Sequence, residues 1–188
     1  GRAASVQEEI DFLLEREELG ATLQKMREEN LLPLRVTHND TKLNNVLLDR
    51  ITRKSLCVLD LDTVMPGLSL YDFGDSIRFG AATAAEDEQD VSKMALDLHL
   101  FEVYTQGFLE AATTLTQREI AMLPMGALVM TLELATRFLK DYLDGDLYFK
   151  TQYPEHNLVR ARTQIRLVAD MQKKMEEMNR IVAQVSSQ

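Results

Sequence analysis

Cysteine, basic clusters and long apolar runs are scarce or missing in this chain of 188 residues. The one cysteine, Cys57, excludes a disulfide within the chain. It lies in an apolar run at residues 56–59, where we expect it to be a small buried hydrophobic residue. Such cysteine usage suits a reducing compartment, and we expect a cytoplasmic location.

Membrane and secretion signals are also missing. No stretch approaches the roughly 18 to 20 consecutive apolar residues of a membrane helix. The N-terminus lacks the basic segment and apolar core of a secretion signal, and it does not begin with methionine, which we interpret as the mark of a fragment. We therefore expect no membrane partner.

Basic residues are fewer than acidic residues. The chain has 21 Lys and Arg against 30 Asp and Glu, which gives a net charge of -9 and a pI near 4.9. Nucleic-acid binding depends on clustered Lys and Arg, and no such cluster stands out, so we expect no nucleic-acid partner. A small anionic ligand on a local basic spot stays compatible with this composition.

The length and composition of the chain indicate one domain. At 45% hydrophobic and 27% charged residues, the chain is long enough to bury a single core. We find no internal repeat, low-complexity run or dividing linker, so residues 1–188 are expected to form one unit. In residues 6–26 apolar side chains recur at helical spacing, with Gly20 as a weak point and Pro33 as a stop.

Most of the remaining chain is predicted to be helical. Thr116 followed by Glu119 forms a capping box, and Pro124 should split or kink the helix that starts there. Three short β-like runs precede this part, so the fold class is α+β and predominantly helical. The expected strands are residues 34–37, 45–48 and 55–60, and the expected helices are residues 90–112, 117–144 and 155–184.

The polar loop between the first two strands carries the candidate chemistry. Asp40 is followed five residues later by Asn45, and Asp60 comes at the end of the next strand. Kinases place their base and metal ligands in this order. We expect Asp40 to lie beside the acceptor hydroxyl, and Asn45 and Asp60 to offer oxygen ligands to Mg²⁺.

Three neighbours complete this hypothesis. Along an extended chain Asp62 would point to the same side as Asp60, so both carboxylates could face one cation. Lys42 could place its ammonium on the transferring phosphate, and His38 is expected to hold the loop backbone. An Asp and an Asn at this spacing also occur in ordinary turns, but the order of the residues and the flanking apolar strands favour catalysis.

A second acidic motif, Asp72-Phe73-Gly74, spells the metal-binding triplet of protein kinases. It lies farther from Asn45 than Asp60 does, so we assign the metal to Asp60. Asp72, with Asp75 and Arg78 at helical spacing, is expected to start and brace a helix beneath the loop, with Asp72 accepting backbone N–H groups.

The segments DTKLNNVLLD and VLDLDTVMPG carry a family resemblance. The region from about residue 34 to residue 149 resembles the aminoglycoside phosphotransferase and choline kinase superfamily, and within it the N-acetylhexosamine 1-kinase-like sugar kinases. The resemblance implies a protein-kinase-like C-terminal lobe with a small β hairpin carrying the catalytic loop. It also implies ATP as co-substrate, Asp40 as base, and Mg²⁺ held by Asn45 and Asp60 with help from Asp62. Asn39 stands where the family usually has glycine.

The same resemblance implies two lobes, and only one is recognisable here. The eight glycines are scattered, and no strand bearing a lysine precedes the loop. We therefore expect the N-terminal nucleotide-binding lobe to be absent, the fragment to be inactive, and the uncovered face to be apolar and to favour homodimers. The alternative is a non-catalytic binding or regulatory module that kept the fold.

The acceptor is expected to be a small hydroxyl compound, and the resemblance implies a sugar bound by the helical lobe. Polar and aromatic residues crowd the end of the long helix near residue 144. Arg137 and Tyr148 are the candidate substrate-binding residues.

Overall fold

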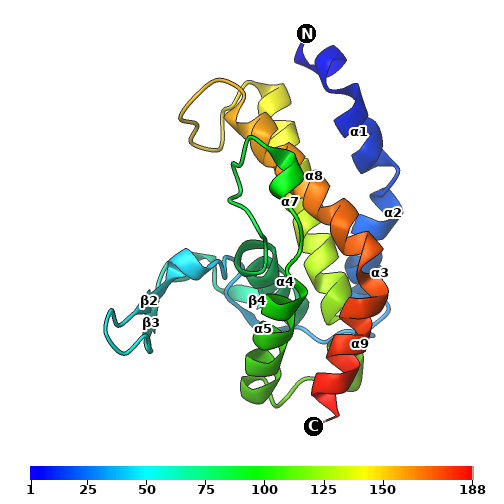
Figure 1. Ribbon diagram of the computed structural model, residues 1–188. Coiled ribbons are helices and arrows are strands. Elements are labelled where there is room, and N and C mark those ends of the chain that lie inside the picture. Colours follow the sequence, from blue (N-terminus) through cyan, green and yellow to red (C-terminus); the bar gives the residue numbers. More distant parts are fainter. Residues whose placement is uncertain (188) are drawn as a thin grey trace.

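The computed structural model describes residues 1–187, and helices dominate it (Figure 1). The long helix α7 is the centre of the fold, with α8 and α4 packed along it and the N-terminal helices on its flank. The helices are α1 (Gln7–Leu14), α2 (Glu17–Gly20), α3 (Thr22–Glu28), α4 (Ser69–Gly80), α5 (Leu98–Ala111), α6 (Gln117–Ala121), α7 (Leu123–Asp144), α8 (His156–Lys173) and α9 (Met175–Ser186), with short 3-10 turns η1 (Arg2–Ser5), η2 (Leu43–Asn45), η3 (Leu61–Thr63) and η4 (Val91–Lys93).

The core forms where α4, α5, α7 and α8 meet. Phe73 on α4 is fully buried and packs edge-on against Phe101, with ring centroids 5.9 Å apart. Two glycines let α4 and α7 approach closely, because a Cβ at Gly74 would lie 2.3 Å from the carbonyl oxygen of Gly126. This close crossing fixes the position of α4, on which the site described below depends.

Several predicted helix boundaries are confirmed. Thr116 and Glu119 form the capping box at the start of α6, and Pro124 lies in the first turn of the separate helix α7. The segment at residues 6–26 forms three short helices, and the second ends at Gly20. The helix expected from residue 90 begins only at Leu98, because the Asp97 side chain caps it by accepting backbone N–H bonds.

Two small antiparallel sheets replace the single strand unit that was expected. β1 (Arg35–Thr37) pairs with β4 (Met65–Gly67), and β2 (Val46–Leu48) pairs with β3 (Ser55–Val58). The sequence predicted β1, β2 and β3 but not β4, because Pro66-Gly67 indicated a break. The polar loop at residues 38–45 therefore joins the two sheets, and the expectation that a hairpin carries it was wrong.

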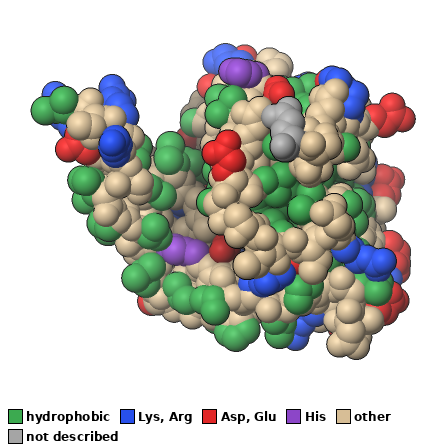
Figure 2. Space-filling view, turned by 90° about the horizontal axis from the view of Figure 1, so that it is seen from below, with side chains coloured by type: hydrophobic (Ala, Val, Ile, Leu, Met, Phe, Trp, Pro, Cys, Tyr) green, Lys and Arg blue, Asp and Glu red, His purple; other side chains and the backbone are tan. Residues whose placement is uncertain are grey.

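The β2–β3 hairpin projects from the helical body (Figures 1 and 2). Every residue of β3 is exposed, including Cys57. The prediction that Cys57 is buried was therefore wrong: its cross-strand partner Leu47 is also exposed, so the part of the chain that the structure describes leaves this pair uncovered.

The helices of residues 1–187 include none that is both long enough and apolar enough to cross a membrane.

Candidate active site

Asp72 ties the polar loop to helix α4. Its Oδ2 accepts the backbone N–H of His38 and its Oδ1 that of Asn39, each at 2.8 Å, and its carbonyl oxygen accepts the Thr41 hydroxyl at 2.6 Å. Asn39 has a φ of 65°, a left-handed conformation that Asn tolerates better than most residues. Burial raises the pKa of Asp72, and the two N–H bonds work against that rise.

His38 joins the loop to the segment that follows β3. Its Nε2 lies 2.8 Å from the carbonyl oxygen of Leu59, and its Nδ1 accepts the backbone N–H of Asp40 at 3.3 Å. The Thr63 hydroxyl donates to the His38 carbonyl oxygen at 2.6 Å. His38 therefore contacts backbone on both sides of the site.

Asp40 and Asn45 lie in direct contact. Asn45 Nδ2 donates to Asp40 Oδ2 and to the Asp40 carbonyl oxygen, each at 2.8 Å. Lys42 Nζ lies 3.0 Å from the same Oδ2. Asp40 Oδ1 has no such contact within residues 1–187, and it is the oxygen that a ligand hydroxyl can approach.

Asp60 is held next to Asn45 by the backbone, because Leu59 N–H donates to the Asn45 carbonyl oxygen at 2.8 Å. Asp60 has a left-handed φ of 61°, and the turn η3 follows it directly. The expected extended geometry from Asp60 to Asp62 was therefore wrong. The turn still brings the two carboxyls together: the hydrogen bond and the charge of Asp62 are the first causes that raise the pKa of Asp60, followed by burial and Asp40.

This donor set fits a magnesium ion. The carboxylates of Asp60 and Asp62 and the amide oxygen of Asn45 supply oxygen ligands, and Mg²⁺ usually takes only one or two carboxylates and keeps several waters. A cation between the two carboxylates would relieve the repulsion that raises the pKa of Asp60. Among the described residues no three His, Cys, Asp or Glu side chains form a metal cage.

A cleft of about 720 Å³ opens beside the loop. Asp40 and Lys42 line one side of it, and Arg137 and Tyr148 line another. The Arg137 guanidinium lies 5.7 Å from the centre of the Tyr148 ring. The structure therefore brings both candidate substrate residues to the cavity that contains Asp40 and Lys42, whereas the remaining predicted site residues do not line it. Those residues are His38, Asn45, Asp60, Asp62 and Asp72.

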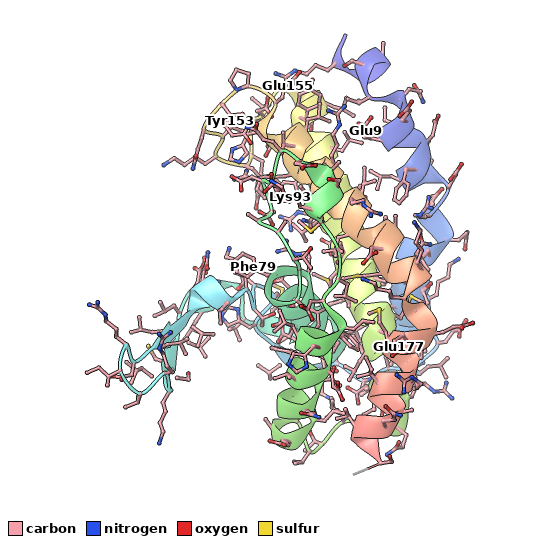
Figure 3. The ribbon with its side chains drawn as sticks, viewed as in Figure 1. Glu9, Phe79, Lys93, Tyr153, Glu155 and Glu177 are labelled. Carbon is pink, nitrogen blue, oxygen red and sulfur yellow. The ribbon has the colours of Figure 1, made fainter. Side chains whose placement is uncertain are left out.

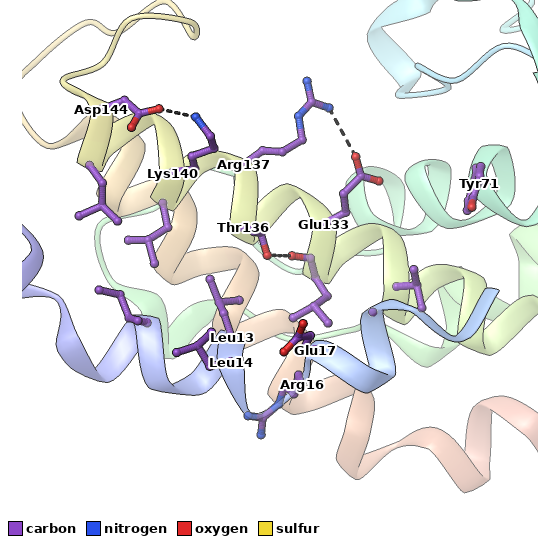
Figure 4. Close-up of a pocket in the computed structure, with 16 residues that line it drawn as sticks. Leu13, Leu14, Arg16, Glu17, Tyr71, Glu133, Thr136, Arg137, Lys140 and Asp144 are labelled. Atoms are coloured by element: carbon purple, nitrogen blue, oxygen red, sulfur yellow. Dashed lines mark hydrogen bonds and ion pairs between the residues drawn. The ribbon is translucent and has the colours of Figure 1, made fainter. Parts of the chain in front are cut away.

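A second cavity, also of about 720 Å³, lies between the N-terminal helices and α7 (Figure 4). Apolar side chains such as Leu13 line most of it, and Tyr71, Glu133 and Arg137 border both cavities. Glu133 and Arg137 form an ion pair of 3.9 Å across this border. None of the predicted catalytic or metal-binding residues lines the second cavity, so we place the candidate chemistry in the first.

The inner wall of the cleft was not predicted. It contains Asp75, Arg78, Glu86 and Arg160, which come from α4, the following loop and α8. A signal for part of it was present, because Asp75 and Arg78 interrupt the apolar surface of a helix at i, i+3 spacing. The contribution of α8 could not be read from local spacing.

A comparison with known families agrees with the geometry. The model of the phosphotransferase enzyme family matches residues 1–107, which is more than half of the chain. The matched region includes the polar loop, Asp60, Asp62 and helix α4, and it ends before α7.

Proposed function

Because the chain belongs to the phosphotransferase enzyme family, we propose that it forms the acceptor- and metal-binding part of an ATP-dependent kinase that phosphorylates a hydroxyl of a sugar. The observation that carries the proposal is the contact between the polar loop and the Asp60 segment. Asn45 contacts Asp40 through its side chain and the Asp60 segment through its backbone. These contacts support the proposal that Asp40 is the base and that Asn45 and Asp60 are metal ligands, in the order that phosphoryl transfer uses.

Asp40 is the proposed base. Its free Oδ1 accepts the proton of the acceptor hydroxyl, while Asn45 and Lys42 hold the other oxygen and fix the orientation of the carboxylate. Lys42 also provides a positive charge near the transferred phosphate. His38 and Asp72 position the loop from below through backbone contacts.

Asn45, Asp60 and Asp62 would hold Mg²⁺, which supplies neutralising charge to the phosphates of ATP when bound. Asp62 lies close enough to Asp60 that its hydrogen bond and its charge raise the pKa of the Asp60 carboxyl. We therefore expect cation binding to weaken as the solution becomes acidic, because protons and cation compete for the same oxygens.

A sugar is the acceptor that suits the cleft. Arg137 and Tyr148 line the cleft together with the aromatic rings of Phe138 and Phe149. Such a wall offers hydrogen-bond donors for hydroxyls and flat apolar surface for the face of a sugar ring. An N-acetylhexosamine-like acceptor is the specific proposal.

A nucleotide-binding lobe belongs to the proposal as a partner. Large apolar side chains are exposed on the projecting arm and beside the loop, including Leu56 at 60% and Leu43 at 56%. Exposed apolar patches of this kind mark interaction surfaces. We propose that an N-terminal lobe covers this face in the complete protein, that the 188-residue chain alone is inactive and self-associates through it, and that the protein works in the cytoplasm.

The test is ATP-dependent phosphorylation of N-acetylhexosamines by the complete gene product, with Asp40→Asn as the matched variant. Loss of the base should reduce kcat by about 10²- to 10⁴-fold. A wild-type protein without activity, or an Asp40→Asn variant as active as the wild type, would instead favour a non-catalytic binding module.

A further inference from the structure

One buried carboxylate holds the loop that follows helix α7. Asp141 lies on α7 and is only 5% exposed. Its Oδ1 accepts the backbone N–H groups of Leu147 at 3.0 Å and Tyr148 at 2.8 Å, and its Oδ2 accepts that of Phe149 at 2.9 Å. Three consecutive N–H groups of residues 145–150, here called the cleft loop, therefore converge on one side chain.

A fourth donor comes from helix α8. Asn157 lies near the start of this helix, close to Glu155, which Figure 3 labels, and it is fully buried. Its Nδ2 donates to Asp141 Oδ2 at 2.8 Å and to Asp146 Oδ1 at 3.0 Å. Burial would raise the pKa of Asp141, but the backbone bonds of the cleft loop and the bond from Asn157 lower it. Neutral N–H groups, rather than a Lys or Arg of residues 1–187, thus stabilise the ionised carboxylate.

The cleft loop has little packing of its own at the residues that lie near the Asp141 carboxylate. Leu147 is 82% and Tyr148 is 74% exposed, and Asp146 has a left-handed φ of 62°. Exposed side chains contribute little burial energy, and a left-handed conformation is uncommon for residues other than glycine. Burying a carboxylate is itself costly. A buried charge therefore fixes the backbone of a loop whose side chains stay open to solvent.

The residues that Asp141 holds form one wall of the cleft. Tyr148, Phe149 and Lys150 line the cleft, whereas Asp141 does not. The rings of Tyr148 and Phe149 meet edge-on with their centroids 4.8 Å apart. The Arg137 guanidinium lies 5.7 Å from the centre of the first ring and 5.5 Å from the centre of the second. A shift of the loop backbone would therefore displace the aromatic surface of this wall from Arg137.

We propose that Asp141 is a positioning residue of the acceptor site, which places Tyr148 and Phe149 against a bound sugar ring without touching the sugar itself. This inference rests on the proposed function and names a residue on which acceptor affinity depends. Rings that are held in place beforehand bind the face of a sugar without the entropic cost of ordering the loop. Asp40 and Lys42 line another side of the cleft, so the chemical step depends much less on Asp141.

The experiment measures sugar binding by titration calorimetry and phosphorylation kinetics with the complete gene product. The probes are N-acetylglucosamine and N-acetylgalactosamine. In Asp141→Asn the single amide oxygen can accept from only one pair of the four donors, and the amide N–H₂ group faces the other pair. We expect the Kd and KM for the sugar to rise at least about tenfold, while kcat and the KM for ATP change less than about threefold.

Asp170→Asn is the matched control. Asp170, on α8, is also buried and also accepts a backbone N–H, that of Leu96, but it does not line the cleft. The substitution also weakens the ion pair with Lys174, so it should lower stability while leaving the Kd and KM for the sugar unchanged. A general loss of stability would affect both variants, whereas a displaced cleft loop affects only Asp141→Asn.

Amide hydrogen exchange of the wild-type protein gives a second readout if Asp141→Asn does not fold. The amides of residues 147–149 should exchange at least about tenfold more slowly than in an unfolded peptide, although the side chains of Leu147 and Tyr148 are exposed. Bound sugar should slow their exchange further, because it packs against the wall that these residues form.

Four results would each overturn the inference. Folded Asp141→Asn could bind the sugar as tightly as the wild type, Asp170→Asn could weaken binding equally, the wild type could bind neither sugar, or bound sugar could leave exchange at residues 147–149 unchanged. Failure of the proposed catalysis has a separate signature. The wild type would then bind sugar without phosphorylating it, or Asp40→Asn would phosphorylate as well as the wild type, while the Kd values still decide the role of Asp141.

Discussion

Asp72 shows how one side chain can determine the conformation of the polar loop at residues 38–45. Its two carboxylate oxygens each accept one backbone N–H, from His38 and from Asn39, immediately before Asp40. Asn39 adopts a left-handed conformation at this point. The paired acceptors therefore hold a backbone turn that would otherwise be unfavourable, and they transmit the position of α4 to Asp40.

The Asp72→Asn variant is expected to lose about 1–3 kcal/mol of unfolding free energy, because an amide N–H₂ group would face a backbone N–H. Urea unfolding measures the loss, and amide hydrogen exchange at residues 38 and 39 should accelerate. Asp97→Asn is the control, since Asn caps helices about as well as Asp. Equal effects of the two substitutions would show that Asp72 has no special role.

Glu119, like Asp72, is a carboxylate that makes several structural contacts at once. It is 1% exposed, it closes the capping box of α6, and its carboxylate accepts bonds from Arg35 and Ser69. Burial alone would raise the pKa of Glu119, but the bonds from Arg35, the Thr116 backbone and Ser69 outweigh it and lower the pKa from 4.5 to about 2. Because Arg35 lies on β1, this carboxylate links the helical body to the strand that precedes the polar loop.

The lowered pKa of Glu119 gives a pH prediction. The stability that its ionised form contributes is complete above about pH 4.5 and is lost as the pH falls toward 2. The contribution is on the order of 3 kcal/mol. The difference in unfolding free energy between the wild type and Glu119→Gln should therefore shrink over this range, as measured by urea unfolding. Glu29→Gln, at an exposed position, should show no such change; a constant difference for Glu119→Gln would contradict the prediction.

Local spacing predicted some of these residues and not others. The positions of Asp40, Asn45 and Asp60 could be read from one short stretch of sequence, because loop and strand order is local information. The inner wall of the cleft, formed by Asp75, Arg78, Glu86 and Arg160, could not, because it depends on the packing of α4 and α8 in three dimensions. A pair of opposite charges at i, i+3 on an otherwise apolar helix indicates that the pair is buried. The sequence does not show which cavity the pair lines.

At the scale of elements, the crossing of α4 and α7 supports the site. Gly74 follows Asp72 by two residues, and its contact with the backbone of Gly126 determines how closely α4 lies against the central helix. The same triplet of residues that resembles a kinase metal motif is thus used here for packing, with Phe73 in the core and Gly74 at the crossing.

Two glycine-to-alanine substitutions, at Gly74 and at Gly107, distinguish the effect of close helix packing on stability from the effect of helix propensity. Gly74→Ala should destabilise the protein by about 1–3 kcal/mol, because its Cβ would lie 2.3 Å from the Gly126 carbonyl oxygen and the helices would have to separate. At Gly107 in α5 an added Cβ would meet nothing within 4 Å beyond its own stretch of helix, so Gly107→Ala should instead be neutral or stabilise by up to about 1 kcal/mol. Thermal unfolding measures both. A Gly74→Ala variant as stable as Gly107→Ala would mean that the crossing can relax.

Helix boundaries were predictable where a cap or proline determines them, as at Thr116 and Pro124. Strand β4 was not, because Pro66 and Gly67 usually end strands, whereas here they pair with Val36 and Arg35. Gly67 is required by the pairing, since a Cβ there would lie 2.4 Å from Thr37 Oγ1. The exposure of Cys57 was likewise not predictable. The sequence of an apolar strand does not show whether the surface that packs against it belongs to the same chain or to another.

At the scale of the whole molecule, the β2–β3 arm is the main departure from ordinary burial. Val46 pairs with Val58 across the arm, and Leu56 lies on the same side as Val58 two residues away. Val46 is half-buried and lines a cavity with Leu100 of α5, whereas Leu56 is 60% and Val58 49% exposed. A two-stranded ribbon with such a face gains stability only from a partner surface.

Self-association of the 188-residue chain follows from this arrangement if no other lobe is present. We expect sedimentation velocity to show dimers or larger species that increase with protein concentration. Leu56→Lys should raise the dissociation constant at least about tenfold, equivalent to about 1.4 kcal/mol, because a charge would have to be buried at the interface. Leu147→Lys, the same change at a residue that is 82% exposed in the loop after α7, should leave association unchanged.

If the wild-type chain stays monomeric at all concentrations, the homodimer prediction is wrong. If both variants weaken association equally, the arm is not the interface.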